Sequence, residues 1–190
     1  MTGRFIVLEG LDGAGKTTQA RILAERLGAL LTAEPTPWLG GASPLVRQAT
    51  PEGAALLFAA DRREHLARVI LPALASGRDV VCDRYTPSML AYQSAAGCDL
   101  DWLAGLDVGR VRVPDLVVVL DLDVAVAAAR VAARDGQAEV LHRVAEGYQL
   151  AERALTDHGW PFARVSALGT PDVVAERIAA VVDGIRPLLA

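Results

Sequence analysis

Short runs of apolar residues alternate along this chain with longer segments in which apolar residues recur at helical spacing. The apolar runs predict strands at 5–8, 30–32, 80–82, 116–120 and 162–165. The helical segments lie at 17–27, 52–75, 101–108, 124–134, 140–158 and 171–185. Strands that alternate with helices in this way predict an α/β fold with a parallel sheet covered by helices on both faces.

Two of these segments are the most informative. Residues 116–120 read Leu-Val-Val-Val-Leu, a continuous apolar run that is typical of a central strand covered on both sides. In 52–75 one stripe of the helix is expected to hold Leu56, Leu57, Ala60, Leu66, Val69 and Ile70. We expect Pro72 to kink the last turns, because proline cannot donate the helical hydrogen bond.

Composition and charge indicate which classes of protein the chain can belong to. With 190 residues, of which 52% are hydrophobic and 22% charged, the chain can fold as one domain spanning 1–190. A net charge of −4 gives no support for a nucleic-acid surface, so any phosphate must be bound by locally placed cations. No stretch is long and apolar enough for a membrane span, and Cys82 and Cys98 lack metal-ligand spacing. We therefore expect a soluble cytoplasmic protein without a membrane or nucleic-acid partner.

Lysine is almost absent from the chain. Eighteen of its 19 basic residues are arginine, and Lys16 is the single lysine. A compact ammonium and a planar guanidinium are not interchangeable at a phosphate, so the position of Lys16 calls for a special explanation.

That explanation is a phosphate-binding loop directly after the first predicted strand. The loop matches G-x-x-x-x-G-K-[ST] and consists of Gly10, Leu11, Asp12, Gly13, Ala14, Gly15, Lys16, Thr17 and Thr18. Backbone N–H groups and the helix N-terminus would bind the phosphates of a nucleotide, Lys16 would reach the β- and γ-phosphates, and Thr17 would ligate Mg²⁺. A glycine-rich turn that only caps a helix would not need the whole pattern, so we interpret the loop as a nucleotide site.

The loop alone does not distinguish a kinase from other P-loop proteins. A switch-type GTPase reads guanine with an N-K-x-D element, and this chain contains no asparagine. The chain is also short for a motor ATPase domain. These exclusions favour a small nucleotide or metabolite kinase.

Four segments resemble the thymidylate kinase family, in the family's order and across about two-thirds of the chain. They are the loop at 10–18, the sequence LLFAADRREH at 56–65, DRYTPS at 83–88 followed by AYQ at 91–93, and PDL at 114–116 leading into LDLD at 120–123. The resemblance implies a P-loop NTPase fold with a five-stranded parallel sheet and a short lid at about 130–140. It also implies Mg²⁺-dependent phosphoryl transfer from ATP to dTMP by a homodimer.

The same resemblance implies roles for individual residues around the acceptor. Phe58 would stack on thymine, and Arg62, on the same helix face, would donate to a carbonyl of the base. The spacing alone explains Phe58 equally well as an aromatic residue of the core. Arg84 would hold the acceptor phosphate, while Asp83 would hold Mg²⁺ through water or cap the next segment. The other acceptor-binding residues are expected to be Glu34, Arg47, Ser88, Tyr92 and Gln93.

Catalytic roles are expected for Asp12, Lys16, Arg84, Arg130 and Arg134. Asp12 would position the acceptor phosphate, or simply form a turn. The loop has no arginine before Lys16, so Arg130 and Arg134, with Arg143 behind them, are the candidates for the transition-state cation; a solvated arginine face is the alternative.

The chain departs from the family pattern in two places. Ala33 stands before Glu34-Pro35 where bacterial members usually have arginine, and the lid is short. Arg47, further along the chain, is the candidate to supply the missing contact. These departures leave one alternative open: a kinase for another or modified pyrimidine monophosphate, such as a modified dUMP. A second alternative, from another class, is a nucleotide-binding regulator with weak catalysis.

Overall fold

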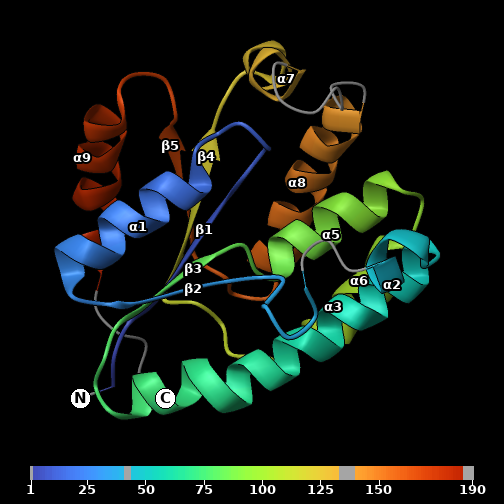
Figure 1. The fold of residues 1–190 in the computed structure, drawn as a ribbon, viewed down its shortest axis with the longest axis horizontal. Helices are drawn as coiled ribbons and strands as arrows, with labels where there is room; N and C mark the ends of the chain where they lie inside the picture. Colours follow the sequence, from blue (N-terminus) through green and yellow to red (C-terminus); the bar gives the residue numbers. More distant parts are fainter. Residues whose placement is uncertain (1, 41–43, 133–139, 186–190) are drawn as a thin grey trace.

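A computed structural model describes residues 2–40, 44–132 and 140–185 of the protein (Figure 1). Five parallel strands form one sheet in the order β2-β3-β1-β4-β5, which confirms the predicted sheet. The strands are β1 (Phe5–Gly10), β2 (Leu30–Ala33), β3 (Val80–Asp83), β4 (Leu116–Asp121) and β5 (Phe162–Ser166).

Helices cover both faces of this sheet. In Figure 1, α1 and α9 lie on one side, and α3, α5, α6 and α8 lie on the other. The α-helices are α1 (Lys16–Leu27), α2 (Pro44–Gln48), α3 (Pro51–His65), α4 (Leu71–Ala75), α5 (Thr86–Ala95), α6 (Leu100–Asp107), α7 (Val124–Ala132), α8 (Leu141–Thr156) and α9 (Pro171–Val182). Within the described ranges, no helix combines the length and the hydrophobicity that crossing a lipid bilayer requires.

Strand side chains alternate between two hydrophobic cores. On β1, Ile6 and Leu8 belong to the core shared with α1 and α9, whereas Phe5 and Val7 belong to the core shared with α3, α5 and α6. Because successive side chains of a strand point to opposite faces and both faces are covered, a central strand must be apolar throughout. This geometry explains the continuous apolar run at 116–120.

The helix predicted at 52–75 is divided into three parts. After α3, residues Leu66–Ile70 form a π-helical turn, labelled η1, and α4 follows. The N–H group of Leu71 donates to the carbonyl of Leu66, five residues earlier. Pro72 has no N–H group with which to continue the α-helical ladder, and the wider turn directly before it accommodates this break.

The sequence pattern did not predict helix α5, and α2 was missed as well. In α5, buried residues lie on all sides of the helix. A helix without a polar face lacks the apolar stripe by which helices are recognised. Its closest packing is with α8, because a Cβ atom on Gly147 would lie 2.3 Å from the carbonyl oxygen of Ala91.

The strand order places two functional segments side by side. Leu8 of β1 pairs in register with Asp83 of β3, so the loop after β1 and the segment after β3 begin at the same sheet edge. Helix α7 follows β4 at this edge (Figure 1). Most of the predicted lid, including Arg134, falls at 133–139, outside the described residues.

Candidate active site

The loop between β1 and α1 has the backbone of a phosphate cradle. Gly13 has a φ of 88°, in the left-handed region that favours glycine, and a Cβ atom there would lie 3.2 Å from the Cβ of Arg130. The buried Lys16 Nζ donates to the carbonyl oxygens of Gly10 at 2.8 Å and Leu11 at 3.0 Å. The ammonium group therefore lies over the loop that binds anions in P-loop proteins.

Lys16 is held in an environment that disfavours its charge. Burial, followed by repulsion from Arg84, lowers the pKa of Lys16 to about 8, although Asp12 and Asp83 act in the opposite direction. A bound polyphosphate would add negative charge beside Lys16 and so favour the charged form of its side chain.

Thr17 and Asp83 form a candidate metal position beside the loop. The Thr17 hydroxyl donates to Asp83 Oδ2 at 2.5 Å, and Asp83 Oδ1 is buried without a hydrogen-bond partner among the described residues. Mg²⁺ takes oxygen ligands and keeps several waters, so one hydroxyl and one carboxylate beside a triphosphate suit it. Within the described ranges, no group of three or more His, Cys, Asp or Glu side chains could hold a metal. The residues present therefore fit an ion that is coordinated mainly by phosphate and water.

Asp12 and Arg84 connect the phosphate loop to a second cavity. Arg84 Nη2 forms an ion pair with Asp12 Oδ1. Burial alone would raise the pKa of Asp12, but Arg84 and then Lys16 outweigh it, so the pKa of this carboxyl lies below its ordinary value. Arg84 has a φ of 73°, an uncommon conformation for a residue with a side chain, and its N–H group donates to the Leu8 carbonyl at 3.0 Å.

The second cavity has a volume of about 390 Å³ and lies on the other side of Arg84. Its lining includes these residues expected at the acceptor: Glu34, Phe58, Arg62, Arg84, Ser88, Tyr92 and Gln93. Pro35, Asp61, Tyr85 and Met89 complete it. Arg47 is exposed on α2 and does not line this cavity, so the structure does not bring it to the other expected residues.

Glu34 and Arg62 are both engaged at the base of this cavity. Arg62 Nε donates to Glu34 Oε2 at 2.8 Å, and its guanidinium carbon lies 5.1 Å from the centre of the Tyr85 ring. The other oxygen of Glu34 lies 3.1 Å from His65 Nδ1. Both Glu34 oxygens therefore have partners within the protein.

Glu9, which belongs to no recognised motif, organises the centre of the site. Its fully buried carboxylate accepts hydrogen bonds from the N–H groups of Tyr85 (2.8 Å) and Ser88 (3.2 Å) and from the hydroxyls of Ser88 (2.6 Å) and Tyr148 (3.0 Å). Burial raises the pKa of Glu9, although the hydrogen bond from Ser88, the charge of Arg84 and the hydrogen bond from the Tyr85 N–H group oppose the shift. A carboxylate at the end of an apolar strand was the signal that could have revealed it.

Asp61 was also missed as a site residue. It is buried, and its Oδ2 accepts from the Thr36 N–H group at 2.7 Å while Oδ1 accepts from the Thr36 hydroxyl. It thereby fixes the loop after β2 against α3, beside Glu34.

Of the three candidate arginines near the lid, Arg130 lies against the phosphate loop. Its Nη1 donates to the Gly13 carbonyl at 2.9 Å. Arg143 is exposed on α8, and Arg134 lies outside the described residues.

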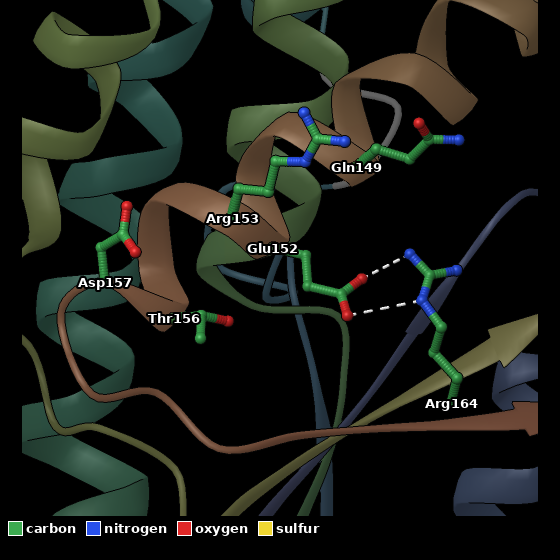
Figure 2. A pocket seen from close by; sticks show the side chains of 6 residues that line it. All are labelled: Gln149, Glu152, Arg153, Thr156, Asp157 and Arg164. Atoms are coloured by element: carbon green, nitrogen blue, oxygen red, sulfur yellow. Dashed lines mark hydrogen bonds and ion pairs between the residues drawn. The ribbon is translucent and has the colours of Figure 1, made fainter.

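A larger cavity of about 670 Å³ lies away from this site, between α8 and β5 (Figure 2). Figure 2 shows Glu152 of α8 and Arg164 of β5 pointing toward each other, with an ion pair between them. Because Arg164 is paired in this way and neither the phosphate loop nor Arg84 borders the cavity, we place the chemistry at the smaller one.

The sheet, the phosphate loop and the adjoining cavity define a P-loop NTPase fold. The model of the family "Thymidylate kinase" matches residues 8–158. The chain is 46% identical to the probable thymidylate kinase of Pyrococcus abyssi over 156 residues, covering 73% of this chain and 75% of that protein. It is 40% identical to the thymidylate kinase of Synechococcus sp. over 206 residues, covering 97% and 96%. The chain belongs to the thymidylate kinase family, as the resemblance implied.

Proposed function

We propose that this protein transfers the γ-phosphoryl group of ATP to dTMP, giving ADP and dTDP. One observation carries the proposal: the phosphate loop and a cavity large enough for a nucleotide base and sugar adjoin each other at the Asp12–Arg84 ion pair. A donor and an acceptor bound on either side of this pair would have their phosphates next to each other, and such alignment is most of what phosphoryl transfer requires.

On the donor side, we propose that the backbone of residues 10–18 and Lys16 bind the phosphates of ATP. Thr17 would ligate Mg²⁺ and Asp83 would hold it through water, as the short Thr17–Asp83 contact and the unpartnered Asp83 oxygen support. When bound, the ion would neutralise charge on the phosphate oxygens.

On the acceptor side, we propose that Arg84 binds the phosphate of dTMP and that Asp12 orients Arg84. A phosphate monoester has its second pKa near 6, so at pH 7 it is already mostly dianionic and needs no general base. Catalysis then depends on alignment and on neutralising charge. Arg130, which lies against Gly13, and Arg134 are proposed to supply positive charge to the transition state.

The base and the sugar would occupy the remainder of the cavity. Phe58 would stack on the pyrimidine, Arg62 would donate to a carbonyl of the base, and Tyr92 would lie against the sugar, with Ser88 and Gln93 beside it. A ribose 2′-hydroxyl buried there without a partner would cost about 1–3 kcal/mol, which would favour deoxynucleotides. Glu34 would act through Arg62, because both of its oxygens have partners.

An assay of ADP release across dTMP, dUMP, dCMP and UMP tests this function. We expect the highest kcat/KM for dTMP and no turnover by Lys16→Ala. A clear preference for another monophosphate would refute the specificity. Tight ATP binding without turnover of any monophosphate would indicate a regulator.

We also propose that the protein acts as a homodimer in the cytoplasm. Exposed Leu45 on α2 and Leu56 on α3 support a contact between subunits, and the free thiols of Cys82 and Cys98 suit a reducing compartment.

A further inference from the structure

The guanidinium of Arg62 is fixed by two buried carboxylates from different parts of the chain. Nε donates to Glu34 after β2, and Nη1 donates to Asp107 at the end of α6. The Arg62 side chain is 2% exposed and that of Asp107 is 0% exposed. No hydrogen bond within the described ranges uses Arg62 Nη2, and Arg62 lines the 390 Å³ cavity. Its remaining donors are therefore available to a ligand.

Asp107 occupies a position that its own helix does not favour. It is the last residue of α6, where the negative end of the helix dipole repels a carboxylate. Its Oδ2 also accepts from the Thr86 hydroxyl at 2.9 Å, while Oδ1 is buried with no hydrogen-bond partner among the described residues. A buried charge at such a position needs partners: the buried Arg62 pairs with its Oδ2, and Nη2 of the partly exposed Arg63 lies 3.8 Å from its Oδ1.

We infer that Asp107 is a positioning residue for recognition of the base. By fixing Arg62 it orients Nη2 so that the cavity accepts a pyrimidine with a carbonyl at position 4 and rejects one with an amino group there. Arginine has donors and no acceptor, so a carbonyl oxygen satisfies it whereas an amino group leaves both partners unpaired. This inference rests on the proposed function, because it concerns the acceptor cavity.

The test compares dTMP with dCMP, which differ at position 4, in wild type and in Asp107→Ala. Calorimetry gives the Kd of each nucleotide, and the kinase assay gives kcat/KM. We expect Asp107→Ala to reduce the dTMP:dCMP affinity ratio at least about tenfold, because a mobile guanidinium no longer penalises the amino group. The Kd for ATP should stay within about twofold of wild type, since the phosphate loop is untouched. Asp107→Asn, which keeps an acceptor oxygen, should give an intermediate ratio.

Two controls separate positioning from a purely structural role. Asp101→Asn changes an exposed carboxylate on the same helix and should alter neither ratio nor ATP affinity. In an Arg62→Ala background, adding Asp107→Ala should not change the ratio further, because Asp107 acts through Arg62.

An unchanged ratio in Asp107→Ala, or an effect that persists without Arg62, would overturn the inference. If Asp107→Ala does not fold, Asp107→Asn decides: a ratio at least about threefold below wild type supports the inference, and a wild-type ratio overturns it. A wild-type protein that prefers to bind dTMP but does not phosphorylate it would refute the proposed function alone.

Discussion

Lys16 is buried at the phosphate loop with a pKa lowered to about 8 by burial and by Arg84. Below that pH its ammonium is charged and can bind a phosphate, and above it the charge is lost. We therefore expect the Kd for ATP of the free enzyme to rise by up to about tenfold per pH unit above pH 8. Calorimetric titrations between pH 7 and 9.5 measure this. Lys16→Arg is the matched control, because a guanidinium stays charged throughout: its ATP binding should be weaker but independent of pH.

Glu9 provides a second prediction, because burial raises the pKa of its carboxyl above the ordinary value of 4.5. The folded state then holds the proton more tightly than the unfolded state, so this group's contribution to stability is lost as pH rises from 4.5 to the raised value. Glu9→Gln does not titrate. The free energy of unfolding of Glu9→Gln minus that of wild type should therefore increase with pH, as urea denaturation at several pH values would measure. A difference that stays constant with pH would contradict the shift.

Residues within a motif could be predicted from the sequence, and isolated residues could not. Lys16 and Thr17 belong to a fixed pattern, and Phe58, Arg62 and Arg84 belong to segments that resemble a family. These residues lie around one loop and one cavity, as the segments that contain them predict. The expectation for Arg47 at the acceptor depends on a looser argument, and Arg47 lies on α2 and is not among the residues that line the cavity. Asp107 acts through contacts between distant segments, which no local pattern encodes.

The same limit applies to whole elements. The helices predicted from an apolar stripe have a polar face, as α1, α8 and α9 do. Helix α5 is packed between other elements and buried on all sides, so its sequence shows no such stripe. The first turn of α5 contains Thr86, Pro87 and Ser88. Because proline is tolerated only at the start of a helix, this sequence does not look like a helix interior.

The contact between α5 and α8 predicts a specific sensitivity to a methyl group. A Cβ atom on Gly147 would lie 2.3 Å from the Ala91 carbonyl oxygen, so Gly147→Ala must push the two helices apart. We expect it to lower the free energy of unfolding by about 1–3 kcal/mol. Because α5 follows Arg84, the KM for dTMP should also rise.

Gly105→Ala is the matched control, since a Cβ atom there meets nothing within 4 Å. This helical position should gain about 0.5–1 kcal/mol of stability on replacement of glycine by alanine. Urea denaturation of both variants checks the pair. If both substitutions change the free energy of unfolding equally, then helix propensity, and not the close approach at Gly147, determines the stability of the Gly147 variant.

For the whole molecule, alternation of strands and helices was enough to predict a parallel sheet, but it carries no information about strand order. The order β2-β3-β1-β4-β5 places β3 beside β1, although β2 and several helices lie between them in sequence. That adjacency brings Arg84 to Asp12 and so creates one site from two segments. The resemblance to a family predicted that these two segments share one site, but neither it nor the periodicity gave the order of the strands.

The proposed homodimer yields the last prediction. Leu56 is 52% exposed on α3, and Leu45 is exposed on α2, which contacts α3. Exposed large apolar side chains on neighbouring helices favour a protein contact. Light scattering after size-exclusion chromatography should give twice the chain mass of 20.0 kDa for wild type. Leu56→Glu would bury a charge in the interface and should shift the mass toward that of one chain. Leu150→Glu, at a residue 44% exposed on α8, adds the same charge elsewhere and should leave the dimer intact. If wild type has the mass of a single chain, or if both variants dissociate alike, then α3 does not form the contact between subunits.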